Sequence, residues 1–165
     1  MITIGILTAS DKGSVGERQD LSGAAIREIV EQAGWKVQTM EIVPDEKDII
    51  QGKLIQYADD LGLDIVFTTG GTGFSPRDVT PEATLAVVDR LVPGIPEAMR
   101  LESLKITPRA MLSRAAAGIR GRTIIINLPG SPKGVRECLN VVFPSLQHGV
   151  DILKGNTGEC AEPVK

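Results

Sequence analysis

The residues best placed to do chemistry follow a short, apolar, β-branched run, Asp64–Phe67, which is typical of a buried strand. Three glycines in four positions, Gly70 to Gly73, let the backbone turn sharply and approach a ligand closely. Thr80-Pro81 then predicts an N-cap with proline at the first helical position. A strand, a glycine loop and a helix N-terminus together present free N–H groups that suit a phosphate. The loop has neither Walker A nor Rossmann spacing, and it carries a cation beside an anion, Arg77-Asp78.

Further charged residues fall in loops predicted at the same edge of a sheet. In parallel sheets, ligands bind beyond the carboxyl ends of the strands. Two like charges 4 Å apart repel by about 1 kcal/mol in water and about 4 kcal/mol at a surface-like dielectric. A hard divalent cation removes that conflict, because Mg²⁺ bridges carboxylates and phosphate oxygens. The loops 9–20, 44–46, 69–80 and 129–134 supply Asp11, Asp20, Asp45, Arg77, Asp78 and Lys133.

These residues predict a magnesium-dependent phosphate or nucleotide site, with Asp45 and Asp78 as the first candidate ligands. Each side chain also has a structural interpretation, and the sequence leaves both open. The functional interpretation is favoured because several such residues are expected at one sheet edge. The structural alternatives are N-caps for Asp45, Asp78 and Ser131, an ion pair between Asp78 and Arg77, and solvated positions for Asp11, Asp20 and Lys133.

Composition narrows the class of protein. The chain has 165 residues, 42% of them hydrophobic, which suits one α/β domain with an ordinary core. Aromatic residues make up 3% and the net charge is −3, which argue against base stacking and against binding to nucleic acid or anionic membranes. The N-terminus does not resemble a signal peptide, and Cys138 and Cys160 lack metal-type spacing, so we expect a cytoplasmic protein. His148, the only histidine, is expected to be a surface or core residue rather than a metal ligand.

The order of elements predicts a mostly parallel sheet covered by helices on both faces. The Arg120-Gly121 turn is too short for a parallel crossover, so residues 115–119 should run antiparallel to their neighbour. We expect five or six strands in one domain over residues 1–154, followed by a polar tail over residues 155–165. The predicted strands cover residues 2–8, 35–43, 64–68, 115–119 and 122–128; the predicted helices cover 21–33, 46–61, 81–90, 132–141 and 144–154, with short helices in 91–114.

The motifs resemble a known family. Thr68–Gly73 followed by Arg77–Thr84 is similar to the signature of molybdopterin adenylyltransferases, the MogA/MoaB family that includes the G domain of gephyrin. Pro44–Glu46 and Asn127–Lys133 match two further motifs, and Ser10-Asp11 fits after the first strand. The resemblance covers nearly the whole chain. It implies a three-layer α/β/α fold with one antiparallel strand and a homo-oligomer, with a trimer expected.

The resemblance also implies a reaction in molybdenum cofactor biosynthesis. Molybdopterin and ATP, with Mg²⁺ present, give adenylyl-molybdopterin and pyrophosphate, and other proteins of the same biosynthesis are expected partners. By motif position, the two family acids fall on Asp45 and Asp78, which the resemblance implies as catalytic residues and metal ligands. The glycine loop would hold the pterin-side phosphate, and Pro129–Ser131 would border the nucleotide. The implied substrate-binding residues are Ser10, Asp11, Thr69, Gly70, Gly71, Thr72, Gly73, Arg77, Pro129, Gly130 and Ser131.

Three alternatives accompany this interpretation. One is a MoaB-type paralogue. The Arg77–Pro81 motif favours the catalytically active form over that paralogue. Another is a CinA-type domain, whose loop carries a different pair after the glycines and a second acidic residue. The third is a non-catalytic molybdopterin-binding or scaffold protein, which the absence of a linker and second domain in this sequence disfavours.

Overall fold

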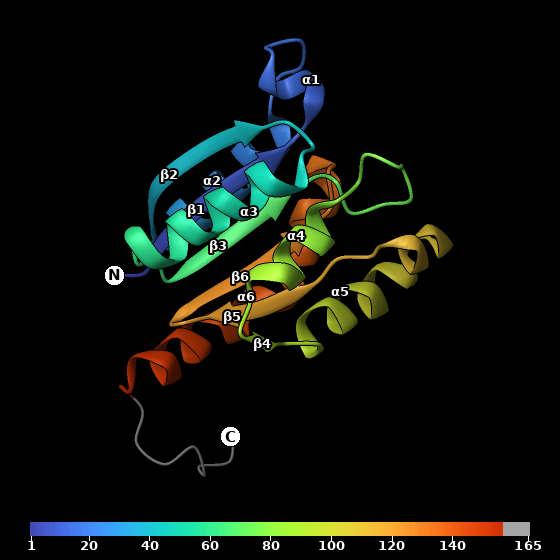
Figure 1. The fold of residues 1–165 in the computed structure, drawn as a ribbon. Coiled ribbons are helices and arrows are strands. Elements are labelled where there is room, and N and C mark those ends of the chain that lie inside the picture. The colour runs from blue at the N-terminus through green and yellow to red at the C-terminus, as the bar shows by residue number, and fades with distance from the viewer. Residues whose placement is uncertain (157–165) are drawn as a thin grey trace.

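The computed structural model describes residues 1–156 and shows a six-stranded sheet in the order β2-β1-β3-β6-β5-β4 (Figure 1). The pairs β1–β2, β1–β3 and β3–β6 are parallel, whereas β5 is antiparallel to both β6 and β4. The predicted sheet with one antiparallel strand is therefore confirmed. The strands are β1 (Thr3–Ala9), β2 (Lys36–Val43), β3 (Ile65–Thr69), β4 (Arg90–Leu91), β5 (Ala117–Arg120) and β6 (Thr123–Leu128).

Helices cover both faces of the sheet, which confirms the three-layer α/β/α arrangement (Figure 1). The helices α2, α5 and α6 pack on one face, and α3, the π-helical turn η1 and α4 pack on the other. A short helix, α1, follows β1, and a 3₁₀ turn, η2, follows α5. The bounds are α1 (Asp11–Ser14), α2 (Leu21–Gln32), α3 (Lys47–Ile55), η1 (Gln56–Asp60), α4 (Thr80–Val87), α5 (Gly94–Leu104), η2 (Pro108–Leu112) and α6 (Pro132–Lys154).

The central strands are buried on both sides, so their sequences are continuously apolar rather than alternating. In β6, Ile124 and Ile126 face the layer of α2, α5 and α6, while Ile125 faces α3 and α4. In β3, Ile65 and Phe67 likewise face the layer of α2, α5 and α6, while Val66 faces α3 and α4. With two aliphatic half-cores fixing their orientation, β1, β3 and β6 end at one edge, where the polar loops begin.

The prediction of two helices over residues 132–141 and 144–154 is wrong, because α6 runs unbroken from Pro132 to Lys154 through Pro144. A proline inside a helix costs about 3 kcal/mol. Here one apolar stripe stays in phase on both sides of it: Val135, Leu139, Val142, Leu146 and Val150 are all buried. Burying a large aliphatic side chain contributes about 1.5–3 kcal/mol, so the stripe outweighs the proline.

Three further boundaries differ from the prediction. The helix predicted over 81–90 ends at Val87, because Arg90 and Leu91 extend to pair with β5. The helix predicted over 46–61 changes to π-helical geometry at Gln56, where it buries Tyr57. The polar loop 9–20 includes α1, whose N-cap Ser10 accepts a hydrogen bond from the Gly13 amide at 3.0 Å.

Within residues 1–156, the structure has no helix long and apolar enough to cross a bilayer. Cys138 is a buried free thiol, and His148 lies exposed on α6. Residues 157–165 of the predicted tail, with Cys160, lie outside the described residues.

Gly5 gives a test of packing between β1 and the helical layer. A Cβ atom there would lie 2.7 Å from Leu63 Cδ1 and 2.8 Å from Tyr57 Cδ2, both fully buried. We expect Gly5→Ala to lower the free energy of unfolding by about 1–3 kcal/mol, because overpacking a core forces strain. The matched control is Gly52→Ala at an exposed position of α3, where a Cβ atom meets nothing within 4 Å. Chemical denaturation should show the control to be as stable as the parent or more so; equal effects of the two substitutions would contradict the packing argument.

Candidate active site

The ends of β1, β3 and β6 approach so closely that their loops require glycine. Gly70 and Gly71 have φ values of 89° and 67°, in the left-handed region that favours glycine. A Cβ atom on Gly70 would collide with the carbonyl oxygen of Ala9, and one on Gly71 would collide with the Thr80 hydroxyl. A Cβ atom on Gly130 would lie 3.3 Å from Gly70 Cα. The glycine loop is therefore held between the loops that follow β1 and β6.

A cavity of about 570 Å³ opens at this meeting point. Its walls come from all four loops predicted at the sheet edge, together with the start of α2. The acids Asp20, Asp45 and Asp78 all line it, together with Gly70 and Gly71 of the glycine loop and Gly130 of the loop after β6. Of the predicted site residues, the lining includes Ser10, Asp45, Thr69, Gly70, Gly71, Asp78, Gly130 and Ser131; Arg18, Gln19, Asp20 and Ser22 are among those added by the structure.

Asp20, which lines this cavity, has a structural role. Its carboxylate accepts hydrogen bonds from the Thr8 hydroxyl at 2.6 Å and from the Gly23 amide at 2.8 Å, so it caps α2 and ties that helix to β1. Ser22 in the first turn of α2 donates to the Gly130 carbonyl at 2.7 Å, and Thr69 donates to the Pro129 carbonyl at 2.7 Å. These bonds fix the loop after β6 against the ends of β3 and α2.

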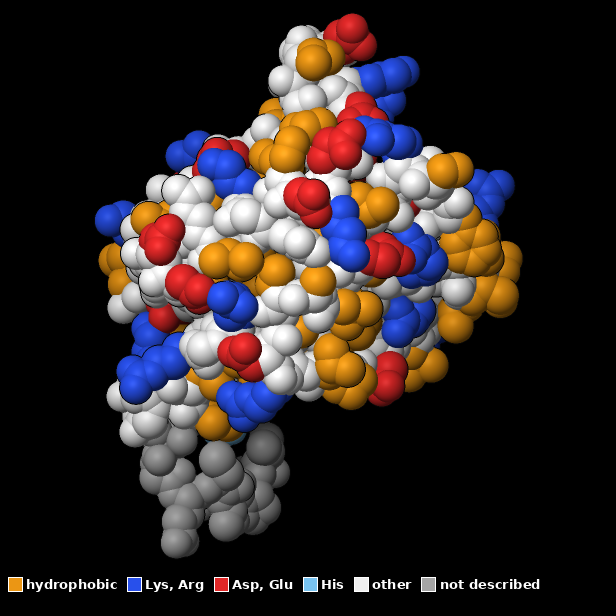
Figure 2. All heavy atoms as spheres, in the orientation of Figure 1, with side chains coloured by type: hydrophobic (Ala, Val, Ile, Leu, Met, Phe, Trp, Pro, Cys, Tyr) orange, Lys and Arg blue, Asp and Glu red, His pale blue; other side chains and the backbone are white. Residues whose placement is uncertain are grey.

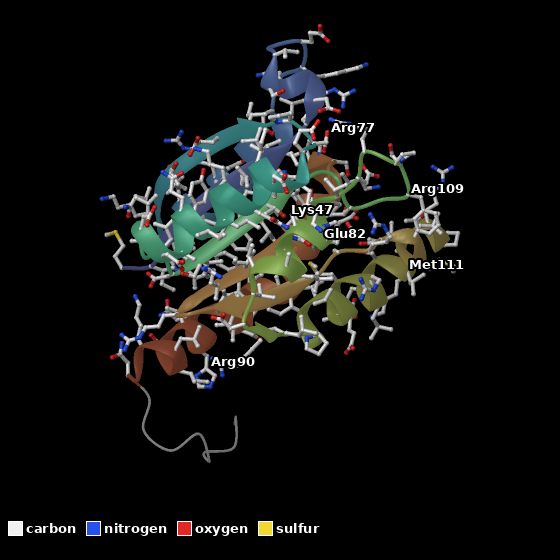
Figure 3. All side chains as sticks on the ribbon, in the orientation of Figure 1. Lys47, Arg77, Glu82, Arg90, Arg109 and Met111 are labelled. Carbon is white, nitrogen blue, oxygen red and sulfur yellow. The ribbon has the colours of Figure 1, made fainter. Side chains whose placement is uncertain are left out.

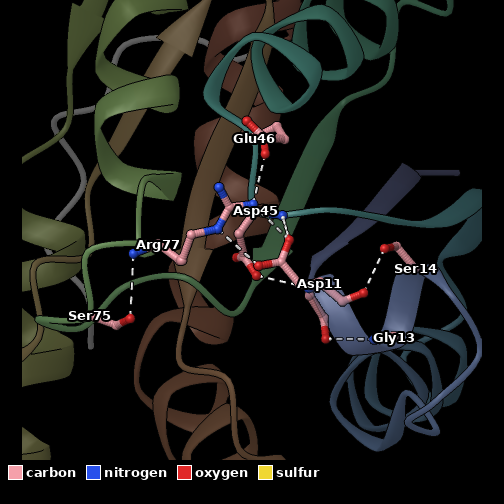
Figure 4. A network of polar contacts seen from close by, with 8 residues as sticks. Asp11, Gly13, Ser14, Asp45, Glu46, Ser75 and Arg77 are labelled. Carbon is pink, nitrogen blue, oxygen red and sulfur yellow. Dashed lines mark hydrogen bonds and ion pairs between the residues drawn. The ribbon is translucent and has the colours of Figure 1, made fainter.

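Asp11 and Asp45 hold the loops after β1 and β2 together through reciprocal bonds (Figure 4). The Asp11 amide donates to Asp45 Oδ2 at 2.9 Å, and the Asp45 amide donates to Asp11 Oδ1 at 3.0 Å. Arg77 closes the network by a bidentate contact with Asp11, at 3.0 and 2.9 Å, and by a bond to Glu46 at 2.8 Å. The predicted ion pair of Asp78 with Arg77 is therefore wrong, and so is the N-cap for Asp45, because Glu46 precedes α3 without a side-chain cap.

Asp78 follows the glycine loop in the sequence, and its Oδ2 accepts a hydrogen bond from the Ser75 amide at 3.0 Å. Burial raises the pKa of Asp45, and the nearby charges of Asp11 and Asp78 raise it further, against the lowering effect of the hydrogen bond from the Asp11 amide. Asp45 and Asp78 thus line one cavity, close enough for the charge of Asp78 to raise the pKa of Asp45.

A second cavity, of about 490 Å³, also borders the loop that follows β6. Its lining is mostly apolar but includes three cations, Arg100, Arg109 and Lys133. Thr72, Gly73 and Pro129 line this cavity rather than the first, and Ser131 lines both. Ser131 is also the N-cap of α6, since it accepts from the Gly134 amide at 3.1 Å, so the structural role considered for it is confirmed.

Two site features differ from the prediction or were missed by it. Thr80 is the first residue of α4 rather than its N-cap, and its hydroxyl is buried with no hydrogen-bond partner among residues 1–156. Arg114, far along the chain, contacts the backbone of the glycine loop and of Asp78. The polar residues before Leu21 carried a signal for the Asp20 cap, whereas Arg114 had no local signal because its partners lie 32–41 positions away.

The fold and site together define an α/β protein whose glycine loop and acidic strand-end loops form one cavity. The chain belongs to the molybdenum cofactor biosynthesis family described as "Probable molybdopterin binding domain", whose match covers residues 5–148. It is 49% identical over 159 residues to a molybdopterin adenylyltransferase of Helicobacter pylori, covering 94% of this chain and 89% of that protein. It is 40% identical to the Escherichia coli molybdopterin adenylyltransferase, covering 99% and 91%.

Solved structures agree with this assignment. The Thermus MoaB structure, described as a molybdopterin biosynthesis enzyme, superposes with a TM-score of 0.89 at 54% identity over 94% of this chain and 98% of that one. A MogA structure superposes with a TM-score of 0.86 at 38% identity over 92% and 99%. A CinA protein from Thermoplasma acidophilum shares the fold, with a TM-score of 0.66 at 19% identity over 87% and 97%.

The raised pKa of Asp45 gives a prediction with a definite sign. The folded state holds this proton more tightly than the unfolded state, so stability falls as pH rises through the ordinary value of 3.8 and stays lower above the folded pKa. We expect Asp45→Asn to raise the melting temperature of the ligand-free protein at pH 7, because the amide oxygen can still accept from Asp11. The gain should disappear as the pH falls below 3.8.

Asp11→Asn is the matched control with the opposite sign. The hydrogen bond from Arg77 holds the pKa of Asp11 below its ordinary value, so that carboxylate stabilises the fold above pH 3.8, and the stabilisation is lost only as pH falls through the lowered value. Melting curves at pH 7 should therefore move in opposite directions for the two variants. A lower melting temperature for Asp45→Asn would contradict the electrostatic account of the site.

Proposed function

We propose that this protein is a cytoplasmic molybdopterin adenylyltransferase that transfers AMP from ATP to molybdopterin. The names of the relatives support the reaction, and the site geometry supports the mechanism. The observation that carries the proposal is the cavity that Asp45, Asp78 and the glycines Gly70 and Gly71 line together. A phosphate at those glycine amides would lie among carboxylates, which is the arrangement expected where a cation accompanies the phosphate.

In the proposed reaction, an oxygen of the pterin's terminal phosphate attacks the α-phosphorus of ATP. A new P–O bond forms there, the bond from the α-phosphorus to the bridging oxygen breaks, and pyrophosphate leaves with that oxygen. The substrate supplies the nucleophile, so the protein needs no activated serine or cysteine. Its contribution is to position two phosphate groups in line and to balance their charge.

The chain's own residues divide this task. The amides of Gly70 and Gly71, with the buried start of α4, would hold the pterin-side phosphate. Gly130 and Ser131 would border the nucleotide, and Arg77 would keep the loops after β1 and β2 closed through Asp11 and Glu46. The two cavities meet at Ser131, so two substrates could lie on either side of it with their phosphates converging at the glycine loop.

Asp45 and Asp78 would hold Mg²⁺. Residues 1–156 contain no group of three or more His, Cys, Asp or Glu side chains suited to a metal. Mg²⁺ is commonly bound by one or two carboxylates together with substrate phosphates and water, so two carboxylates that line one cavity with the glycine loop fit it. When bound, the ion would neutralise negative charge on the phosphates, and Asp45 and Asp78 would fix where that charge is neutralised.

A second candidate function is molybdopterin binding without turnover, as in a MoaB-type paralogue or a scaffold protein. It is favoured by relatives such as Dictyostelium gephyrin, 45% identical, of which this chain covers 22%. Release of pyrophosphate from ATP that depends on molybdopterin would support the enzyme. Tight molybdopterin binding with no pyrophosphate would support the binding protein.

Asp78→Asn tests the catalytic assignment. The amide oxygen can still accept from the Ser75 amide, and the glycine loop is unchanged, so molybdopterin should still bind. We expect turnover to fall at least ~10²-fold, about 2.7 kcal/mol, as for the loss of one positioned electrostatic group. Pyrophosphate release, pterin binding and melting temperature should be measured on one preparation. Asp151→Asn, on the far end of α6, is the control, and near-normal turnover of Asp78→Asn with unchanged magnesium dependence would exclude the assignment.

We also propose a homo-oligomer, a trimer by family resemblance, in which part of residues 91–114 packs between subunits. Exposed apolar side chains gather where α5 ends and η2 begins, and Figure 2 shows hydrophobic surface at that end of the molecule. Such a patch is uncommon on a monomer. The exposed residues are Leu101, Leu104, Ile106, Met111 and Leu112.

Sedimentation at micromolar concentration tests the assembly. We expect the parent to sediment as an oligomer and Met111→Lys to shift it toward monomer, because a buried charge at a subunit interface is strongly unfavourable. Figure 3 shows Met111 projecting from η2, beside Arg109 at the end of the molecule. Ile49→Lys, which places the same charge at an exposed position of α3, should leave the oligomer intact. A monomeric parent would refute the proposed assembly.

A further inference from the structure

Arg114 lies in the segment between η2 and β5 and contacts the glycine loop through both its side chain and its backbone amide. Its side chain donates from Nε to the Gly73 carbonyl at 2.7 Å and from Nη2 to the Asp78 carbonyl at 2.7 Å. Its Nη1 donates to the Glu82 carboxylate, and its backbone amide donates to the Thr72 carbonyl at 2.9 Å. One residue thus contacts four points between the glycine loop and the first turn of α4.

The two side-chain contacts to carbonyls span the exposed part of the loop. Residues 74–77 are exposed, and Gly73 and Asp78 are the residues on either side of them. The guanidinium therefore fixes both ends of this exposed segment to each other. The Asp78 carboxylate belongs to the same closed turn, since it accepts from the Ser75 amide while the Asp78 amide donates to the Ser75 carbonyl at 2.9 Å.

Glu82 accepts the third side-chain hydrogen bond of Arg114. It lies in the first turn of α4, and Figure 3 shows it close to Lys47 of α3. Burial acts to raise the pKa of Glu82, but the hydrogen bond from Arg114 and the charge of Lys47 hold that pKa below its ordinary value. The carboxylate is thus ionised at neutral pH and orients Arg114 toward the two carbonyls.

We propose that Arg114 is a positioning residue for adenylyl transfer, which fixes Asp78 relative to the glycine loop. This inference rests on the proposed function. A planar guanidinium reaches three acceptors at once, whereas a lysine ammonium on a flexible stem cannot reproduce that fork. The Gly70–Gly71 cradle depends on other bonds: the Thr80 amide donates to the Gly71 carbonyl at 3.2 Å, and the Arg114 amide keeps Thr72 in any variant. Loss of the guanidinium should therefore displace Asp78 while leaving the phosphate cradle in place.

The test is Arg114→Lys, with Arg114→Gln as a second variant. We expect kcat for molybdopterin-dependent pyrophosphate release to fall at least ~10-fold with KM for both substrates within about threefold, in line with loss of an interaction made mainly in the transition state. Backbone amides in residues 73–78 should exchange with solvent faster in the ligand-free variant, by a similar factor. A purely structural role would lower the melting temperature without this separation of kcat from KM.

Arg120→Lys is the matched control. Arg120 binds the Asp59 carboxylate through two nitrogens and the Val87 carbonyl at 2.7 Å, so it makes the same kinds of contact at the opposite end of α4. It should lower the melting temperature with parental kcat and parental exchange over residues 73–78. The comparison therefore removes the general effect of replacing a partly buried arginine.

Each other outcome has a defined meaning. Parental kcat, a raised KM with unchanged kcat, or unchanged exchange over residues 73–78 in the Arg114 variants would overturn the inference. Failure of both variants to fold would also overturn it, because Arg114 would then support the whole fold rather than one loop. If the parent itself releases no pyrophosphate, the proposed function fails, and amide exchange alone decides whether Arg114 orders Asp78.

Discussion

The close approach of three strand-end loops constrains everything else in this site. Gly70 packs against the Ala9 carbonyl and against Gly130, so the loops after β1, β3 and β6 cannot move apart without opening the sheet edge. The aliphatic layers on both faces hold those strands in parallel register, and the loops therefore meet at a fixed place. Charged groups that the chain places after its strands are thereby forced together.

That convergence has an electrostatic consequence. Asp45 and Asp78 line the same cavity, and the charges of Asp11 and Asp78 help to raise the pKa of Asp45. The charge of Arg77, which pairs with Asp11 and Glu46, lowers the pKa of Asp45 and so offsets part of this conflict, while Arg114 pairs with Glu82. Neither Arg77 nor Arg114 bonds to the Asp45 or Asp78 carboxylate within the described residues.

Much of this could be predicted from sequence because the signals are local. Apolar β-branched runs located β1, β3 and β6, the Arg120-Gly121 turn identified the antiparallel strand, and glycines with Thr80-Pro81 marked the loop. The errors arose where tertiary contacts decide: in-phase burial carried α6 through Pro144, and pairing with β5 ended α4 at Val87. The Asp20 cap is local, since its partner Gly23 lies three positions along. Asp45 and Arg77, which bind Asp11, and the side-chain partners of Arg114 lie 32–66 positions away, so only the folded chain identifies these contacts.

The fate of isotope-labelled ATP tests the proposed adenylyl transfer at this glycine loop most directly. In a single turnover with molybdopterin and Mg²⁺, label in the α-phosphate should move to the pterin product, while label in the γ-phosphate should appear only in pyrophosphate. Label from the γ-phosphate on the pterin, or in inorganic phosphate with ADP as the other product, would contradict the account. So would α-phosphate label that stays in ATP while molybdopterin is bound.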